Sequence, residues 1–390
     1  MKNKTTSSLI AAALLMATSA VGPGFLTQTT VFTESLGASF GFVILTSILI
    51  DIGVQLNIWR VIAASKRRAQ DIANMVLPGL GIFLSVLIIF GGLAFNIGNI
   101  AGAGLGLEAL FGIDIKTGSI ISSLIAVTVF ANRQAGKAMD LFTQVLGFMM
   151  ILAIFYIATV SHPPLGEAAL RTVAPLKIDF MAIITLVGGT VGGYITFAGG
   201  HRLIDAGISG AENLPKVNKS AVMGISVVAF IRIFLFLGSL GIISQGLPIN
   251  NNNPTGSVFE LAAGSFGFKL FGLVIFAAAV TSIIGSAYTS VSFIKSFSPK
   301  ISKNENWFII IFIMISMFTF IAIGKPVNLL IIAGAINGII LPISLSVMLV
   351  ASYNSNIVGA YKQPFWLTFI GISIVIIMSF MSIKILSDLF

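Results

Sequence analysis

The stretch TLVGGTVGGYITFAGGHRLID, residues 185–205, decides the fold of this chain. It is apolar enough to lie in a membrane, yet it carries three Gly-Gly pairs, which begin at Gly188, Gly192 and Gly199. A glycine costs about 1 kcal/mol relative to alanine inside a helix, so three pairs argue against an uninterrupted rod. They predict a helix that breaks near the middle of the membrane and exposes its backbone to something bound there. The alternative is that these glycines only let helices pack closely.

A second stretch has the same character. Residues 21–42, VGPGFLTQTTVFTESLGASFGF, place apolar flanks around a polar centre at residues 28–33. Two interrupted spans, one in each half of a chain, are typical of transporters that bind their substrate between two repeats. The pair of stretches therefore predicts a binding site at mid-membrane depth.

The composition identifies the broad class. The chain has 390 residues, of which 56% are hydrophobic and 9% charged, whereas soluble domains carry roughly 25% charged residues. This is an integral membrane protein. The absence of cysteine excludes disulfides and thiolate metal sites. Because no nucleophile–base pair, cofactor motif or polybasic arm is present, we expect neither an enzyme nor a cofactor nor a nucleic-acid partner.

Apolar runs long enough to cross a bilayer predict an all-α protein of about eleven transmembrane helices. We interpret residues 1–390 as one transporter domain with approximate inverted repeats over 8–160 and 179–352 and an extra helix over 364–388. Residues 1–20 also resemble a signal peptide, but the apolar run continues to Phe25, so we take them into the first span. The predicted spans lie near residues 8–32, 38–63, 78–104, 115–132, 138–160, 179–206, 215–245, 262–295, 307–324, 326–352 and 364–388.

The loops predict the orientation. Those after the second, fourth, sixth and eighth spans carry basic residues, and all fall on the side of Lys2 and Lys4. By the positive-inside rule that side is cytoplasmic. In a soluble protein the net charge of +9 would instead suggest a nucleic-acid partner. We therefore expect a plasma (inner) membrane protein with a cytoplasmic N-terminus and an extracytoplasmic C-terminus.

Polar groups inside spans are functional candidates because their burial is costly. Asp51 in the second span is read either as a functional group or as half of a structural ion pair with Arg232 in the seventh. Glu34 follows the first polar stretch and is a candidate for a vestibule or for coupling. Asn96 and Asn99 share a helix face, where they either line the transport path or hydrogen-bond between helices.

With these residues in view, the chain resembles the NRAMP family of divalent-metal transporters, which has the LeuT-like fold with broken helices 1 and 6. The resemblance covers nearly the whole chain. It rests on GPGFL at 22–26, GGTVGGYITFAGG at 188–200, LFGLVIFAAAVTSIIGSAYTSVSFI at 270–294 and ILPISL at 340–345.

The departures from that family concern its metal ligands. Counted from Gly22, the aspartate of the family's Asp-Pro-Gly-Asn motif falls at Thr33. A carboxylate, an amide and a thioether are then missing from the metal shell, and neutral oxygen donors suit an organic solute better than Mn²⁺ or Fe²⁺. The family's Met-Pro-His falls at Gly192, Gly193 and Tyr194. Its acidic pair of the third helix falls at Asn96 and Asn99.

Three hypotheses follow. The first is a secondary transporter for a small polar, amino-acid-like organic solute; Gly192 and Gly193 give it room beside the backbone and Tyr194 a hydroxyl or an aromatic wall. The second is a Mg²⁺- or Mn²⁺-type transporter in which Thr33 and Glu34 are the ligands. The third is a membrane sensor or scaffold that does not transport. The coupling ion, proton or sodium, stays open. The expected substrate-binding residues are Gln28, Thr30, Thr33, Gly189, Gly192, Gly193 and Tyr194, with Glu34, Asp51, Asn96 and Asn99 for the path or coupling.

Overall fold

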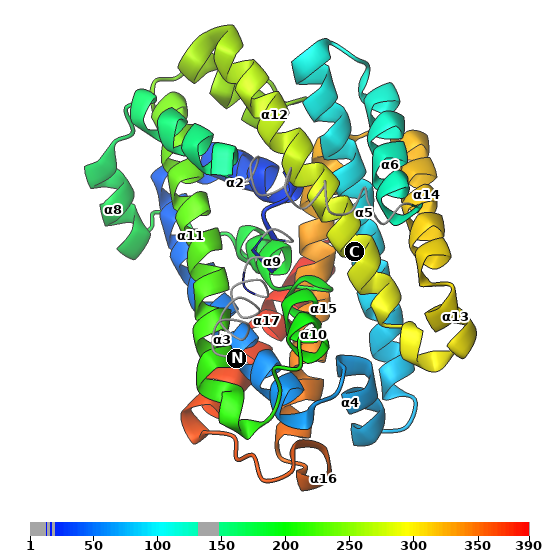
Figure 1. The fold of residues 1–390 in the computed structure, drawn as a ribbon. Coiled ribbons are helices and arrows are strands. Elements are labelled where there is room, and N and C mark those ends of the chain that lie inside the picture. Colours follow the sequence, from blue (N-terminus) through cyan, green and yellow to red (C-terminus); the bar gives the residue numbers. More distant parts are fainter. Residues whose placement is uncertain (1–12, 14–15, 18–19, 132–147, 390) are drawn as a thin grey trace.

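The computed structural model describes residues 13, 16–17, 20–131 and 148–389, and their regular elements are helices (Figure 1). Parts of the first and fifth predicted spans, 8–32 and 138–160, lie outside these residues. The elements are α2 (Pro23–Leu36), η1 (Gly37–Ser39), α3 (Phe40–Ser65), α4 (Ala69–Val76), α5 (Leu80–Phe111), α6 (Ile115–Ala131), a helix over Phe148–Val160, α8 (Leu165–Val173), α9 (Phe180–Thr190), α10 (Ile195–Asp205), η2 (Ala211–Asn213), α11 (Leu214–Ser244), α12 (Pro254–Ser292), η3 (Lys295–Phe297), α13 (Pro299–Lys303), α14 (Glu305–Ile323), α15 (Pro326–Ser352), α16 (Ser355–Val358) and α17 (Phe365–Leu389).

The lengths of these helices fit a bilayer. Within the described residues, eight helical runs are long and apolar enough to cross a membrane, and a ninth forms if the bent pair Phe148–Val160 and Leu165–Val173 counts as one span. The apolar helix α6 is shorter. These helices confirm an integral membrane protein, whereas the exact number of eleven spans stays a prediction.

Several predicted boundaries fall within a residue or two of the observed ones. The spans predicted over 326–352 and 215–245 correspond to α15 and α11. The span predicted over 262–295 begins inside α12, where Ala263 and Gly264 leave helical geometry and Gly264 has φ +63°. The extra N-terminal turns of α12 start at Pro254 and are capped by the Asn253 side chain, which accepts a hydrogen bond from the Gly256 N–H.

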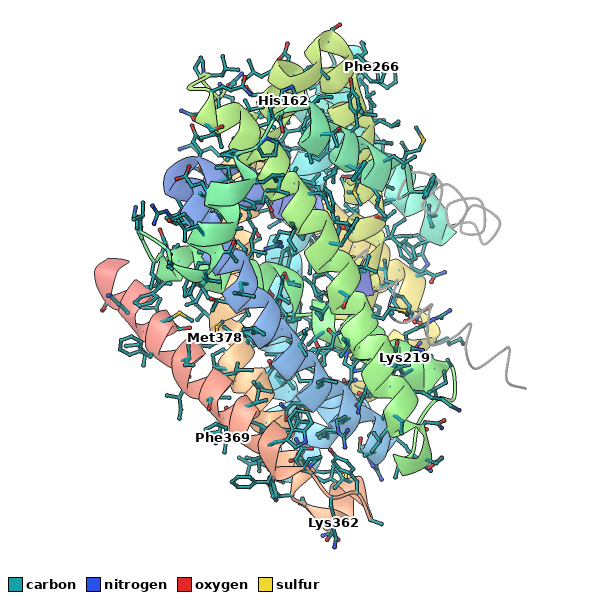
Figure 2. All side chains as sticks on the ribbon, turned by 90° about the vertical axis from the view of Figure 1, so that its left-hand side faces the viewer. His162, Lys219, Phe266, Lys362, Phe369 and Met378 are labelled. Atoms are coloured by element: carbon teal, nitrogen blue, oxygen red, sulfur yellow. The ribbon has the colours of Figure 1, made fainter. Side chains whose placement is uncertain are left out.

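The α9–α10 pair occupies the centre of the bundle. In the most apolar 18-residue segment of α9–α10, 89% is buried inside the protein. In the equivalent segments of α14 and of α17 only 33% is buried. In the centre of the bundle α9 packs against α2, α3 and α15 (Figure 1), and Figure 2 shows α17 along the outside with Phe369. The Phe369 side chain is 64% exposed, as expected of a residue that faces lipid tails. The glycine-rich stretch therefore lies at the centre of the bundle, enclosed by other helices.

Basic residues gather at one end of the bundle, which we call the basic end and define by Lys66, Arg67, Arg68, Lys219 and Lys362. Figure 2 places Lys219 and Lys362 toward this end and His162 and Phe266 toward the opposite one. At the basic end Arg68 forms an ion pair with Asp205 at 2.6 Å, which links the turn after α3 to the last residue of α10. The asymmetry agrees with the loop pattern on which the predicted orientation rests.

Candidate functional site

Two breaks interrupt helices inside the bundle. The first is at Val21 and Gly22, between helical Ala20 and the start of α2 at Pro23. The second covers residues 191–194, between α9 and α10. Gly193 there has φ +53°, which a glycine adopts at no steric cost, and Pro23 suits the first position of a helix because the N–H it lacks has no partner there. The second break is where the sequence predicted one.

The first break is not where the sequence predicted it. We expected the polar residues 28–33 to interrupt the helix, but α2 runs without a break from Pro23 to Leu36. The reason is local: the Thr29 hydroxyl donates to the Phe25 carbonyl at 2.7 Å, and the Thr33 hydroxyl donates to the Thr29 carbonyl at 2.6 Å. Threonine hydroxyls bonded one turn back satisfy themselves within a helix and leave its backbone intact.

The polar residues of α2 point in different directions. The Gln28 amide donates to the Leu330 carbonyl of α15 at 2.9 Å and leaves its Oε1 without a partner. The Thr30 hydroxyl lies on the other face, 3.3 Å from the Ser239 hydroxyl of α11 and 3.1 Å from that of Thr255 in α12. These side chains therefore do not line one surface.

Thr33 and Glu34 also fail to meet as a metal site. The Thr33 hydroxyl is engaged within its own helix, while the Glu34 side chain is exposed near the end of α2. Among the residues that the structure describes, no group of three or more His, Asp or Glu side chains could hold a metal ion.

The glycines of the second break provide close packing instead of open space. A Cβ on Gly192 would lie 2.6 Å from the Gly188 backbone and 2.8 Å from the Asn337 carbonyl. A Cβ on Gly188 would lie 2.0 Å from the Gly334 carbonyl of α15. A Cβ on Gly193 would be closer still to the Asn337 side chain. The expected room beside Gly192 and Gly193 is therefore absent, and these glycines allow close packing as well as the break.

Gly189 is packed in the same way, against α2. A Cβ at that position would lie 2.7 Å from Oε1 of Gln28, so the two predicted site residues do meet. This contact joins α9 to α2 between the two breaks.

Asn96 is an interhelical hydrogen-bonding residue. Its Nδ2 donates to the Ser316 hydroxyl of α14 at 3.0 Å, and its Oδ1 accepts from the Ser286 hydroxyl of α12 at 2.9 Å. Both ends of the amide are thus used between α5, α12 and α14. These hydrogen bonds are typical of a residue that joins helices, the second of the two expected roles.

Asn99, one turn later on α5, connects the two breaks. Its Oδ1 lies 3.1 Å from the position of a Cβ on Gly22, and its side chain interacts with that of Tyr194, the last residue of the second break. The Asn99 Nδ2 is buried and has no partner. An unpaired buried amide in this position is free to bind a ligand or water.

Tyr194 and two serines complete the polar surface beside Asn99. Tyr194 is fully buried, interacts with Ser286, and meets the Phe95 ring edge-on with centroids 5.7 Å apart. The Ser282 hydroxyl lies 2.9 Å from the position of a Cβ on Gly22. We call Gly22, Asn99, Tyr194, Ser282 and Ser286 the break cluster. Sequence reasoning missed both serines, whose only signal was the small-residue run in the eighth predicted span.

A buried charge lies next to both breaks. Arg232 of α11 is 2% exposed, and its Nη2 donates to the Thr190 hydroxyl at 3.3 Å. Asp51 of α3 is also 2% exposed and is the opposite charge that acts on it. Thr190 was not expected at the site, although it directly precedes the second break.

We expect the two asparagines to differ when each is replaced by alanine. Asn96→Ala removes two buried hydrogen bonds and leaves their serine partners behind, so it should destabilise the protein by about 2–3 kcal/mol. Asn99→Ala should lower the stability of the protein less than Asn96→Ala does, and it should weaken ligand binding more than Asn96→Ala does. Thermal unfolding and ligand binding of both purified variants check this difference. If Asn96→Ala unfolded like the parent but no longer bound the ligand, Asn96 would belong to the residues that line the transport path.

One pocket lies away from both breaks. It has a volume of about 810 Å³ and is lined by residues at the end of α5, before and within α12, and around the start of α15. Its lining includes Glu108, Asn252, Glu260, Lys325 and Asn328, and it contains no member of the break cluster. It is therefore separate from the break cluster.

Comparisons with known proteins bear on the whole chain. The family model described as natural resistance-associated macrophage protein-like matches residues 13–388. The uncharacterized membrane protein YcsG of Bacillus subtilis is 59% identical over 377 residues, which are 97% of this chain and 93% of that protein. An uncharacterized membrane protein of Haemophilus influenzae is 53% identical over 378 residues, 97% of this chain and 95% of its own.

Solved structures share the fold at low sequence identity. A mutant of the manganese transporter of Eremococcus coleocola superposes with a TM-score of 0.77 at 16% identity, covering 99% of this chain and 87% of that one. MhsT in complex with L-phenylalanine gives a TM-score of 0.64 at 16% identity, with 98% of each chain covered. The fold is thus the LeuT-like fold of membrane transporters. The chain belongs to the natural resistance-associated macrophage protein-like (Nramp) family of membrane transport proteins.

Proposed function

We propose that the protein is a secondary-active transporter that moves a small polar organic solute by alternating access. The solute binds at the break cluster, where the first and second breaks meet through Asn99. The observation that carries this proposal is the donor set: one amide with an unpaired Nδ2, a tyrosine and serine hydroxyls, all neutral. Such groups bind a solute by hydrogen bonds.

The breaks add a field that favours negative groups. The helices α2 and α10 both begin at a break, and the N-terminus of a helix carries roughly half a positive charge. Broken helices in transporters place such ends near anionic parts of a substrate. An amino-acid-like solute, which has a carboxylate, fits this arrangement.

We propose that the metal-binding motif of the family aligns with the first break and not with Thr33. Gly22-Pro23-Gly24 lies at the break and shares Pro-Gly with the family's Asp-Pro-Gly-Asn. In this alignment Gly22 takes the place of the aspartate and Phe25 that of the asparagine, so Thr33 is no longer involved. The thioether position remains at Gly192. Three strong ligands of a divalent ion are thus replaced by groups without side-chain donors.

A divalent-cation transporter is the second candidate. It is favoured by the fold shared with the manganese transporter of Eremococcus coleocola. Against it stands the buried Arg232, whose Cζ lies 4.1 Å from the centroid of the Phe25 ring at the first break. A guanidinium this close repels a divalent cation, and Asp51 leaves the local charge balanced instead of negative.

The membrane topology belongs to the proposal as well. We propose eleven spans, two inverted repeats over 8–160 and 179–352, and the extra helix 364–388. The basic end faces the cytoplasm together with the N-terminus, and the C-terminus is extracytoplasmic in the inner membrane. The accessibility of single cysteines introduced at Lys66 and at Asn252, measured from each side of the membrane, tests this topology. The native chain has no cysteine, so each introduced cysteine is the only thiol.

Thermal stabilisation of the purified protein tests the proposed substrate class. A ligand at a hundred times its dissociation constant adds about 2.7 kcal/mol to the stability of the folded state. We expect a raised melting temperature with small organic solutes and no shift with Mn²⁺ or Mg²⁺, and uptake of the stabilising solute into proteoliposomes. Stabilisation by the metals alone would overturn the organic-solute proposal in favour of the second candidate.

A further inference from the structure

Arg232 is an ionised group that the break cluster does not use. It lies within the apolar helix α11 with 2% of its surface exposed. Arginine keeps its charge under all ordinary conditions, so the cost of burying it must be offset by charged or hydrogen-bonding partners. The position of those partners indicates what the guanidinium does.

Arg232 contacts helices at both breaks. Its Nη2 donates to the hydroxyl of Thr190, the last residue of α9 before the second break, at 3.3 Å. Its Cζ lies 4.1 Å from the ring centroid of Phe25, three residues after Gly22 at the first break. The guanidinium is thus next to the N-terminal turn of α2, whose Gly22 N-cap provides no side-chain cap.

Part of the guanidinium is unengaged. The Arg232 Nη1 is buried without a hydrogen-bond partner, and so is the Asp51 Oδ1. Among the described residues, the ion pairs with an N···O distance within 4 Å are Arg68–Asp205 and Lys295–Glu305, so Asp51 and Arg232 make no direct contact. Thr190 lies between the two: its hydroxyl accepts from Arg232 Nη2, donates to the Leu186 carbonyl at 2.8 Å, and interacts with the Asp51 carboxylate.

We propose that Arg232 binds the carboxylate of the transported solute, which makes that solute a small carboxylic acid or an amino acid. This inference rests on the proposed function and names its substrate class. A guanidinium matches a carboxylate with two parallel N–H···O bonds, and the free Nη1 supplies one of them. The N-terminus of α2 beside Phe25 adds positive potential. Asp51 balances the charge of Arg232 when the site is empty.

The competing interpretation is a purely structural charge pair between Asp51 and Arg232. Single substitutions cannot separate the two, because removing one charge leaves the other buried alone. The double variant Asp51→Asn with Arg232→Gln removes both charges; the first replacement is isosteric, and the second keeps a polar side chain that is two heavy atoms shorter. It should fold under either interpretation but bind a carboxylate only if Arg232 is structural.

The experiment compares matched solutes on matched variants. Lactate, N-acetylglycine and L-alanine, each beside its carboxamide, are tested by thermal stabilisation and equilibrium dialysis, with Mn²⁺ and Mg²⁺ in parallel. The proteins are the parent, the double variant, Arg232→Lys, and the control Arg68→Gln with Asp205→Asn, which neutralises the ion pair at the basic end. Arg232→Lys keeps the charge and provides the readout if the double variant does not fold.

The expected result is binding of at least one carboxylate and not of its carboxamide. The affinity for that carboxylate should fall about a hundredfold in the double variant. It should fall by a smaller factor in Arg232→Lys and stay unchanged in the control Arg68→Gln with Asp205→Asn. Equal binding of acid and carboxamide, unchanged carboxylate binding in the double variant, or unchanged carboxylate binding in Arg232→Lys would overturn the role of Arg232 and leave the organic-solute function standing. Binding of the metals alone would instead remove the proposed function itself.

Discussion

Replacing Gly192 by leucine should remove the folded protein and not merely its ligand binding. The sequence suggested that a side chain here would fill a substrate cavity, but backbone atoms already occupy that space. A Cβ would lie 2.6 Å from Gly188 and 2.8 Å from the Asn337 carbonyl. Overpacking a core costs typically 1–3 kcal/mol, and more where the obstacle is backbone that cannot rotate away. We expect the monodisperse peak in size-exclusion chromatography to be lost.

The control for this prediction is a glycine with open surroundings. Gly166 of α8 is exposed and has no heavy atom within 4 Å of the position of its Cβ. Gly166→Leu should therefore purify and unfold like the parent. If Gly192→Leu also purified as a monodisperse protein and lost only ligand binding, the space beside Gly192 would be a ligand cavity after all.

The interrupted centre of the fold could be predicted because glycine acts locally. Three Gly-Gly pairs within residues 185–205 oppose a continuous helix whatever surrounds them, and the chain does break at residues 191–194. The same local reasoning wrongly predicts a break at the polar residues of α2. Threonine looks polar in a sequence, but in Thr29 and Thr33 the hydroxyl is satisfied by the carbonyl one turn back.

The candidate site itself depends on contacts between distant parts of the chain. Asn96 and Asn99 have the same side chain on the same face of α5, and only their neighbours on other helices separate their roles. Asn96 meets Ser286 and Ser316, whereas Asn99 meets the two breaks. The sequence indicates a charge within a span at Arg232, but the contacts of Arg232 with Thr190 and Phe25 join residues 42 and 207 positions apart in the sequence. No local pattern encodes such pairs.

An aspartate at Gly22 should turn the site toward cations. Gly22 has φ −104°, which any residue can adopt, and aspartate is favoured at a helix N-cap. Its Cβ would lie 2.9 Å from the Ser282 hydroxyl and 3.1 Å from Oδ1 of Asn99, and the serine can rotate away. The carboxylate would join these oxygens as ligands for a hard divalent ion. We expect Gly22→Asp to gain a melting-temperature shift with millimolar Mn²⁺ or Mg²⁺ that the parent lacks.

The same substitution should oppose an anionic solute, because two like charges 4 Å apart repel by about 4 kcal/mol at an effective dielectric constant of 20. A third of that energy already weakens carboxylate binding about tenfold. Thr33→Asp is the matched control. It adds the same charge to α2 eleven residues further on, where the Thr33 side chain bonds within its own helix, so neither metal nor carboxylate binding should change much. If the metal shift appeared in Thr33→Asp and not in Gly22→Asp, the aspartate of the family motif would belong at Thr33. The break at Gly22 would then lie outside the substrate site.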